Sequence, residues 1–315
     1  MKISIIVSTY NRSKSLEKVI KNILSLKYDG SFNYEIIIVD NNSKDNTKEI
    51  VESYFLKSNR LRYIFEPKQG VSNARNAGIN SAKGEILAFT DDDVIINEDW
   101  LQNIVNFSKN HDFDALGGKV IAMYPKETPQ WIKDCKDILC GPIVSHDYGD
   151  SVQSYNNSML PFIGANMIIK HKTLDEIGCF NILIGLGHGT MGEDSEIFRR
   201  LQINNKKIIY NPDIIIFHPV DTDRMNLKYF AKWHMAQGKY LTSKNIENNN
   251  INFVYLFGAP RYLFREAIYL LWKMIKSLNN KRLFIKAYTD LFVRFGMIIA
   301  YRSRINKSVL KMSLI

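Results

Sequence analysis

The chain has 315 residues, of which 45% are hydrophobic and 23% are charged, a balance typical of a globular protein with a large buried core. Its three cysteines are an odd number without CxxC spacing, which argues against a disulfide framework and against a cysteine zinc site. The net charge of +10 is uneven, because residues 226–315 hold 16 Lys and Arg but 3 Asp and Glu, and this asymmetry predicts a boundary near residue 225.

The apolar residues show neither an export signal nor a membrane span. Met1 and Lys2 lead directly into a short strand-like run, without the pattern of a signal sequence. Uninterrupted apolar runs also stop short of the roughly 20 residues that a spanning helix needs. We therefore expect a cytoplasmic protein that does not cross a membrane.

The first 115 residues alternate short apolar strands with helical patterns, which predicts an open, mostly parallel α/β sheet with crossover helices. Strands are expected at 3–8, 35–40, 62–67 and 85–90, and helices around 16–24, around 50–54 and from residue 71. Farther along, the pattern predicts strands at 115–123, 160–170 and 206–218, and helices at 173–178 and 195–202.

Polar residues follow three of the predicted strands at the point where each ends. They are Thr9 to Arg12 after the first strand, Asp40 to Asn42 after the second and Asp91 to Asp93 after the fourth. Ligands of open α/β sheets bind outside the carboxyl ends of the strands. We therefore expect these residues to converge on one site.

The acidic triplet after the fourth strand needs a positive partner, because neighbouring carboxylates repel one another. In an extended segment Asp91 and Asp93 point the same way, about 6.5–7 Å apart, while Asp92 faces elsewhere. Mg²⁺ or Mn²⁺ bound to a diphosphate suits this geometry. The alternative is a solvated turn that leads into Trp100.

Four segments occur in a characteristic order: "SIIVSTYNR", "VDNNSKDNT", "GVSNARNAGINSAKGEILAFTDDDV" and "GEDSEIFRRL". Over residues 3 to 220 the chain resembles the inverting nucleotide-sugar glycosyltransferases of family 2, which have the GT-A fold and include enzymes of bacterial surface polysaccharides. The resemblance implies a Rossmann-like GT-A domain at 1–225, with the nucleotide sugar bound by about 1–115 and the acceptor side and catalytic base in about 116–225. Residues 226–315 are left as a basic, amphipathic helical appendage.

The resemblance also implies roles for individual residues on the donor side. The base and ribose are expected at Thr9, Tyr10, Asn11 and Asp40, and the phosphates at Arg75. Asp91 and Asp92 belong to the same nucleotide-sugar site. Asp93 is the expected main metal ligand with Asp91, although some members use the carboxylate corresponding to Asp92, and His218 is a candidate third ligand.

On the acceptor side, the resemblance assigns the catalytic base to Asp194 of "GEDSE", with Glu193 and Asn166 near the acceptor. An inverting transfer needs one carboxylate that takes the proton of the attacking hydroxyl. The alternative is that these acids only favour the start of a helix. The preceding "GHGTMG" matches GxGxxG, but two acids follow it, so we interpret it as an acceptor-side loop and not as a dinucleotide site.

The basic C-terminal region predicts contact with an anionic membrane surface. Segment 260–278 has an apolar side and gathers Arg261, Arg265, Lys273 and Lys276 on another. This fits a lipid-linked acceptor and a peripheral location on the inner face of the cell membrane. The alternative is a pair of packed helices with solvated charges. No nucleic-acid-binding motif is present, so we expect no nucleic acid partner.

Together, these features predict an inverting enzyme that depends on Mn²⁺ or Mg²⁺ and moves one sugar from a nucleoside diphosphate, with UDP-sugars favoured, to a saccharide or lipid-linked acceptor. The family's processive synthases carry a QxxRW motif, which this chain lacks. Two other functions stay open, namely a catalytically silent sugar-nucleotide binding protein and a nucleotidyltransferase.

Overall fold

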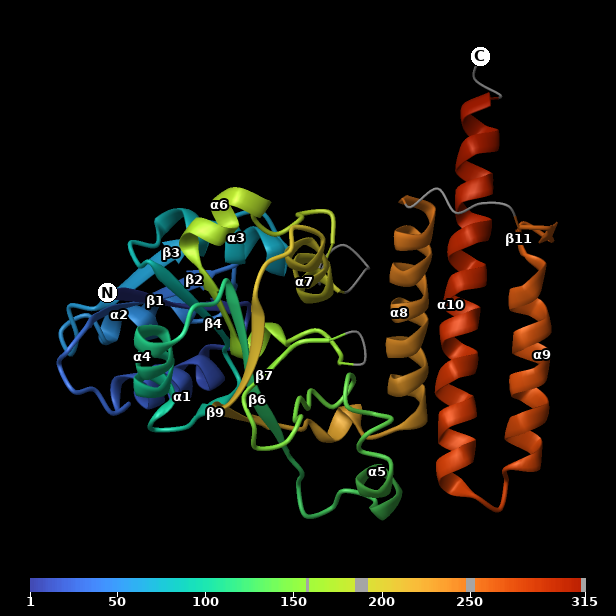
Figure 1. Ribbon diagram of the computed structural model, residues 1–315, viewed down its shortest axis with the longest axis horizontal. Helices are drawn as coiled ribbons and strands as arrows, with labels where there is room; N and C mark the ends of the chain where they lie inside the picture. Colours follow the sequence, from blue (N-terminus) through green and yellow to red (C-terminus); the bar gives the residue numbers. More distant parts are fainter. Residues whose placement is uncertain (157–158, 185–191, 248–252, 313–315) are drawn as a thin grey trace. The chain divides into compact units, whose positions relative to one another are not determined.

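The structure is a computed structural model that describes residues 1–156, 159–184, 192–247 and 253–312, with the backbone alone for 243–247 and 304–312 (Figure 1). The chain forms two compact units. The sheet unit consists of Met1–Tyr124, the described residues between 144 and 184, and Glu193–Val220. The helical unit consists of Pro125–Ile143, Gly192 and the described residues from Asp221 onward.

The first half of the sheet unit alternates parallel strands with helices, as predicted. The elements are β1 (Lys2–Thr9), α1 (Ser13–Leu24), β2 (Asn33–Asp40), α2 (Thr47–Ser53), β3 (Leu61–Phe65), α3 (Val71–Ser81) and β4 (Ile86–Asp91). The central strands are nearly continuous apolar runs because both of their faces are buried. One core cluster includes Ile5 and Leu16, and a second cluster on the other side of β1 includes Ile6 and Ala74.

The second half completes a mixed, mostly parallel sheet flanked by helices, which confirms the predicted fold class. Its elements are β5 (Ile95–Ile96), α4 (Trp100–Asn110), β6 (Ala115–Met123), β7 (Gln153–Ser154), β8 (Met167–Lys170), α6 (His171–Ile177), α7 (Glu193–Ile203) and β9 (Ile208–Pro219). The strand order is β3-β2-β1-β4-β8-β6-β9-β5, and β7 pairs with β9. Strand β8 runs antiparallel to both β4 and β6, whereas β6 and β9 are parallel.

The predicted strand at 160–170 was too long. Only Met167–Lys170 pairs in the sheet, and the 3₁₀ turn η1 (Gly164–Asn166) precedes it. Side chains distant in sequence hold this turn, because Trp100 Nε1 donates to Asn166 Oδ1 at 2.9 Å and Asp194 Oδ2 accepts from the Gly164 amide at 2.7 Å. Periodicity along the segment contains no trace of such contacts.

The helical unit packs α10 (Lys281–Met312) against both α8 (Leu227–Glu247) and α9 (Arg261–Lys276) (Figure 1). Helices α8 and α10 approach closely at a pair of glycines, since a Cβ on Gly238 would overlap the Val293 carbonyl oxygen and one on Gly296 would overlap that of Met235. The remaining elements are α5 (Gln130–Asp134), the 3₁₀ turn η2 (Thr222–Arg224) and the hairpin of β10 (Tyr255–Leu256) and β11 (Ala259–Pro260).

Within the described residues, none of the helices combines the length and the apolar character that crossing a membrane requires.

Candidate active site

The site lies where the parallel strands β1, β2 and β4 end. Thr9 pairs with Asp40 across β1 and β2, and Ser8 pairs with Asp91 across β1 and β4. The register therefore places the three polar segments that follow these strands at one edge of the sheet, as expected for parallel strands in this order.

The acidic triplet at this edge divides in two. Asp92 turns inward and is buried, with Oδ2 accepting from Thr9 Oγ1 at 2.6 Å and Oδ1 from Arg12 Nη1 at 3.2 Å. Arg12 also pairs with Asp93. Asp92 and Asp93 thus tie the triplet to the segment after β1 through Arg12, while Asp91 and Asp93 also lie near His218.

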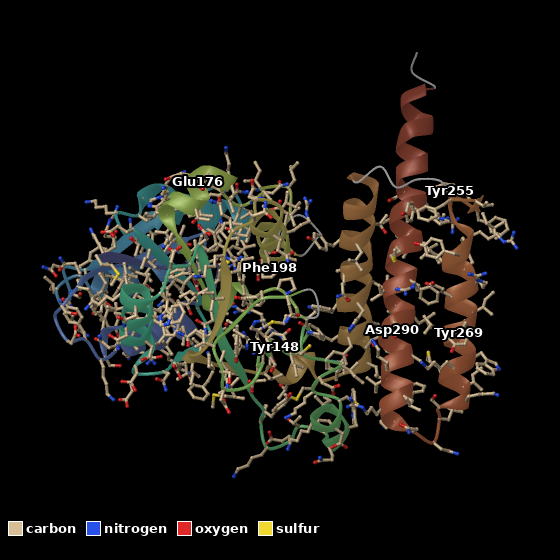
Figure 2. All side chains as sticks on the ribbon, viewed as in Figure 1. Tyr148, Glu176, Phe198, Tyr255, Tyr269 and Asp290 are labelled. Carbon is tan, nitrogen blue, oxygen red and sulfur yellow. The ribbon has the colours of Figure 1, made fainter. Side chains whose placement is uncertain are left out.

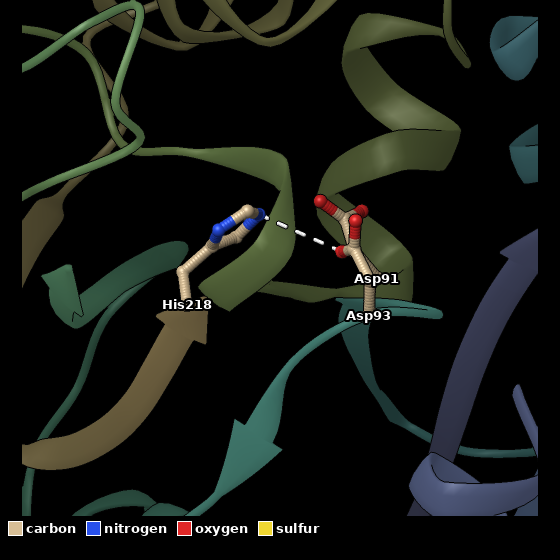
Figure 3. Close-up of side chains that lie close together, drawn as sticks. All are labelled: Asp91, Asp93 and His218. Carbon is tan, nitrogen blue, oxygen red and sulfur yellow. Dashed lines mark ion pairs between the residues drawn. The ribbon is translucent and has the colours of Figure 1, made fainter. Parts of the chain in front are cut away.

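Asp91, Asp93 and His218 form a cluster with the geometry of a cation site. One ligand atom from each of the three lies within 4.8 Å of the others, and Figure 3 shows the imidazole facing the two carboxylates. His218 Nε2 lies 3.5 Å from Asp93 Oδ1. Strand β9 brings the histidine to this edge from more than 120 positions farther along the chain.

The hydrogen bonding of His218 favours ligation through Nε2. Its Nδ1 lies 3.0 Å from the Pro219 carbonyl oxygen, which is an acceptor only, so Nδ1 carries the proton. The lone pair of the neutral ring is then on Nε2, the atom that faces Asp93. Metal-bound histidines commonly have their other ring nitrogen bonded to a carbonyl in this way.

The electrostatics of the triplet also fit a cation. Burial raises the pKa of Asp91 to about 7, and neighbouring Asp93 adds to this effect although Arg75 opposes it. Burial likewise raises the pKa of Asp92. The neighbouring arginines therefore do not fully compensate the negative charge of these carboxylates at neutral pH. A divalent ion is the kind of group that supplies the missing positive charge. Two carboxylates and one imidazole suit Mn²⁺, and Mg²⁺ completes its shell with phosphate oxygens and water.

Arg75 joins the acidic triplet to the acids of α7. Its Nη1 lies 2.7 Å from Asp194 Oδ1 and 3.2 Å from Glu193 Oε1, and its Nη2 lies 3.8 Å from Asp91 Oδ1. Burial alone would lower the pKa of Arg75, but Asp194, Glu193 and Asp91 raise it. In this structure the guanidinium, expected beside phosphates, compensates three carboxylates.

The two acids that open α7 are in different environments. Burial, followed by the charge of Asp194, raises the pKa of Glu193 to about 7. Asp194 is held by Arg75 on Oδ1 and by the backbone amide of Gly164 on Oδ2, at 2.7 Å each. Its carboxylate is thereby fixed in orientation, which a general base requires.

Three residues at this site received no role from the sequence. A side chain on Gly164 would overlap the Arg75 guanidinium, so this glycine allows the contact between η1 and α3. The Phe180 ring lies 5.2 Å from the centre of that guanidinium, and Arg12 holds the triplet from the other side. An isolated glycine in an apolar run marks a close approach and was the one local signal of these contacts.

Asn166, expected near the acceptor, uses its side chain within the fold. The residue is fully buried, and its Oδ1 accepts from Trp100 Nε1. Its Nδ2 donates to the carbonyls of Lys119 and Ile214, at 3.0 and 2.8 Å. Both amide hydrogens are used, so the side chain ties β6, β9 and α4 together and stabilises the fold.

The residues expected at the nucleotide take part in turn contacts. Asp40 Oδ1 accepts from the Ser43 amide and Oδ2 from Tyr63 Oη, both at 2.8 Å. The first contact is a local bond across three residues, which holds the loop after β2 but is not an Asx turn, since that turn spans two residues. Asn11 has a positive φ of 52° and accepts from the Lys44 amide at 2.6 Å. Tyr10, directly after β1, is 46% exposed.

The interpretation of "GHGTMG" as an acceptor-side loop concerns residues 187–192, of which 187–191 lie outside the described residues.

Comparison with known families gives a match over more than half of the chain. The sequence model described as Glycosyl transferase family 2 matches residues 4–185. This range includes β1 to β4, the acidic triplet, Arg75 and η1.

Named glycosyltransferases are among the similar curated proteins. Glycosyltransferase AglE of Haloferax volcanii is 36% identical over 124 residues, but the match covers 39% of this chain and 40% of that relative. The succinoglycan biosynthesis protein ExoM of Rhizobium meliloti is 24% identical over 241 residues, 75% of this chain and 73% of the relative. The GalNAc(5)-diNAcBac-PP-undecaprenol beta-1,3-glucosyltransferase of Campylobacter jejuni is 39% identical over 94 residues, 29% of each chain.

A solved structure has a similar fold. The mannosyltransferase PcManGT from Pyrobaculum calidifontis, in complex with GDP-Man and Mn²⁺, matches with a TM-score of 0.56 and 18% sequence identity. The match covers 99% of this chain and 80% of that chain. It supports the GT-A-like fold predicted from the sequence.

Proposed function

The chain belongs to glycosyl transferase family 2 and is a glycosyltransferase, and from this premise we propose that it is an inverting, metal-dependent and non-processive enzyme. It transfers one sugar from a nucleoside diphosphate to a hydroxyl of a saccharide or lipid-linked acceptor. The observation that carries the proposal is the convergence of Asp91, Asp93 and His218 at the carboxyl edge of the sheet, with Arg75 linking them to Asp194.

Asp91, Asp93 and His218 would hold Mn²⁺ or Mg²⁺. When bound, the ion supplies positive charge that stabilises the leaving diphosphate. Asp92 supports the two ligands beside it through its contacts with Thr9 and Arg12. The Mn²⁺ in the similar mannosyltransferase agrees with this assignment.

Asp194 is the proposed base. An acceptor hydroxyl gives its proton to the carboxylate while its oxygen attacks the anomeric carbon from the face opposite the diphosphate, so the configuration inverts and no covalent nucleophile is needed. Arg75 and the Gly164 amide hold the carboxylate in place. Glu193 lines the acceptor side, and its raised pKa allows it to hold or release a proton near neutral pH.

The donor nucleotide is assigned to the ends of β1 and β2, with Thr9, Tyr10, Asn11 and Asp40 around the base and ribose. The exposed ring of Tyr10 offers a stacking surface for a base, and the buried Asp40 carboxylate accepts hydrogen bonds. UDP-sugars and GDP-sugars are the first donors to test, since GDP-Man is the ligand of the similar structure.

The acceptor is proposed to be lipid-linked, in polysaccharide biosynthesis at the cytoplasmic face of the cell membrane. Two relatives support this assignment by their names, one through an undecaprenol-linked saccharide and the other through succinoglycan biosynthesis. In the proposed division of labour, residues 1–225 are catalytic and 226–315 serve the membrane surface.

Replacing Asp194 with Asn tests the proposal. We expect turnover to fall by about 10²–10⁴-fold, while UDP or GDP binding in Mn²⁺ is retained. Asp112→Asn is the matched control, because this aspartate is exposed and forms an ion pair with Lys170 away from the site. The turnover of this variant should equal that of the wild type. A wild-type protein that binds nucleotide sugars without turnover would be a silent binding protein. Release of pyrophosphate from a nucleoside triphosphate would identify a nucleotidyltransferase.

A further inference from the structure

Helix α9 has apolar residues on two sides, and only one of them is packed. Leu263, Ala267 and Leu270 are buried against the unit's core. Ala267 and Leu270 form a cluster with Ala287 and Leu291 of α10. These contacts explain why one set of apolar residues recurs along α9: they pack the helix against α10. They do not explain the other apolar residues of the segment.

A second side of α9 exposes another set of large apolar residues. Ile268 and Ile275 are each 68% exposed, and Leu271 and Trp272 are exposed beside them. At 100° per residue these four lie within about 100° of one another, on a side centred about 120° from the packed one. Figure 2 shows side chains of α9 that project away from α10.

The β10–β11 hairpin extends this apolar surface beyond the start of α9. Phe257 at its tip is 76% exposed and has a positive φ of 45°, and Gly258 follows with a φ of 79°. The Phe257 ring lies 6.3 Å from that of Phe264 in the first turns of α9. A strained turn that holds an aromatic ring in solvent needs a compensating contact.

Cations border the same side of α9. Arg261 and Arg265 lie within about 40° of Trp272 around the helix, and Lys276 Nζ lies 4.1 Å from the Trp272 ring centroid. The one acid of α9, Glu266, pairs with Arg294 of α10 at 2.5 Å. The outer face therefore combines hydrocarbon with positive charge and contains no acid.

We propose that this outer surface, formed by Phe257, Phe264, Ile268, Leu271, Trp272 and Ile275 with the bordering cations, docks on an anionic lipid bilayer. The apolar side chains enter the boundary of the acyl chains while arginine and lysine contact lipid phosphates, and α9 lies parallel to the surface. The usefulness of this position rests on the proposed function, because a lipid-linked acceptor is presented there. Binding itself needs neither donor nor acceptor.

Charge decides between the bilayer and a second copy of the chain. Two copies that paired through this face would bring their arginines and lysines together without an acid on the face to compensate them, because Glu266 is paired with Arg294, and this repulsion costs free energy. An anionic surface compensates the same charges and attracts them over about one Debye length.

Co-sedimentation of the full chain with vesicles tests the proposal without donor or acceptor. We expect binding to vesicles of phosphatidylcholine with 30% phosphatidylglycerol, roughly five-fold weaker for each cation removed by Arg265→Gln or Lys276→Gln. Ile268→Glu with Ile275→Glu should abolish binding. Leu56→Glu, a matched change at a fully exposed leucine of the sheet unit, should leave it intact.

Each other result would overturn the inference. Docking on the bilayer is refuted by a wild type that stays in the supernatant with vesicles at low salt. It is equally refuted by an Ile268→Glu, Ile275→Glu variant that binds vesicles like the wild type. In sedimentation velocity without vesicles, a wild-type dimer that this variant dissociates would show that a second copy covers the face. Transfer to a soluble acceptor, measured in parallel on the same proteins, separates a failure of docking from a failure of the proposed catalysis.

Discussion

The carboxyl edge of β4 buries charge, whereas the outer face of α9 exposes hydrocarbon. Asp92, Arg75 and most of Glu193 are removed from solvent at the first region, while Ile268 and Ile275 are more than half exposed at the second. Charged side chains are usually exposed and large apolar side chains are usually buried, and each region reverses one of these tendencies. We propose a different partner for each region, a cation with a diphosphate at the sheet edge and a lipid surface at the helix.

The sheet edge and the helical unit are also stabilised by different kinds of interaction. At the sheet edge, position is fixed by directional contacts between ionised groups, such as Arg75 with Asp194. In the helical unit, position is fixed by shape, such as the glycine contact of α8 with α10. Substitutions at the edge should therefore change ligand binding and stability through charge and hydrogen bonds, whereas substitutions between the helices should change stability through packing.

The largest effect should come from Asp93→Ala, which removes a ligand from the proposed cation site. We expect Mn²⁺-dependent binding of nucleoside diphosphate to weaken by more than about 100-fold in calorimetry, because the remaining carboxylate and imidazole hold the ion poorly. Removing Mn²⁺ with EDTA should weaken wild-type binding to the same extent. Equal affinity of the wild type with and without EDTA would refute the cation site.

A smaller loss is expected from Arg75→Lys. A lysine keeps the charge but cannot contact Asp194, Glu193 and Asp91 together, so the free energy of unfolding should fall by about 2 kcal/mol. Arg265→Lys is the control, since Arg265 is exposed on α9 and its replacement by lysine should change stability little. Urea unfolding of both variants measures the difference. Equal losses would mean that burial of the Arg75 cluster adds nothing.

Gly238→Ala should test the packed side of the helical unit. The new Cβ would overlap the Val293 carbonyl oxygen and force α8 and α10 apart, so we expect a loss of about 1–2 kcal/mol despite the better helix propensity of alanine. Nucleotide binding in Mn²⁺ should be unchanged, because the site belongs to the sheet unit. A variant that is as stable as the wild type would show that the helices adjust without cost.

The smallest expected effect is a difference in stability between substitutions of two buried threonines near the site. Thr9→Val removes the hydrogen bond to Asp92 and should cost about 1 kcal/mol. Thr90→Val should cost nothing or stabilise slightly, because the Thr90 hydroxyl has no hydrogen-bond partner among the described residues. Thermal unfolding without metal compares the pair. A larger loss for Thr90 than for Thr9 would contradict this account of the triplet.

The order of elements and the polar strand ends could be predicted because they depend on local patterns. Alternation of apolar strands with helices predicted β1 to β4, and the same pattern placed Asp40 and Asp91 at strand ends. The orientation of Asp92 away from Asp91 and Asp93 also follows from the two-residue period of a strand. The burial and the full hydrogen bonding of Asn166 could not be predicted, because they depend on Trp100, Lys119 and Ile214.

The sequence by itself therefore determined the fold class, the family and the edge of the sheet where charge accumulates, since these follow from periodicity and from motifs contiguous in the chain. The tertiary structure decided that Arg75 faces carboxylates, that His218 joins Asp91 and Asp93, and that α9 leaves one apolar side uncovered. These features depend on which distant segments pack together. Burial and ion pairing are properties of that packing, and no local pattern encodes them.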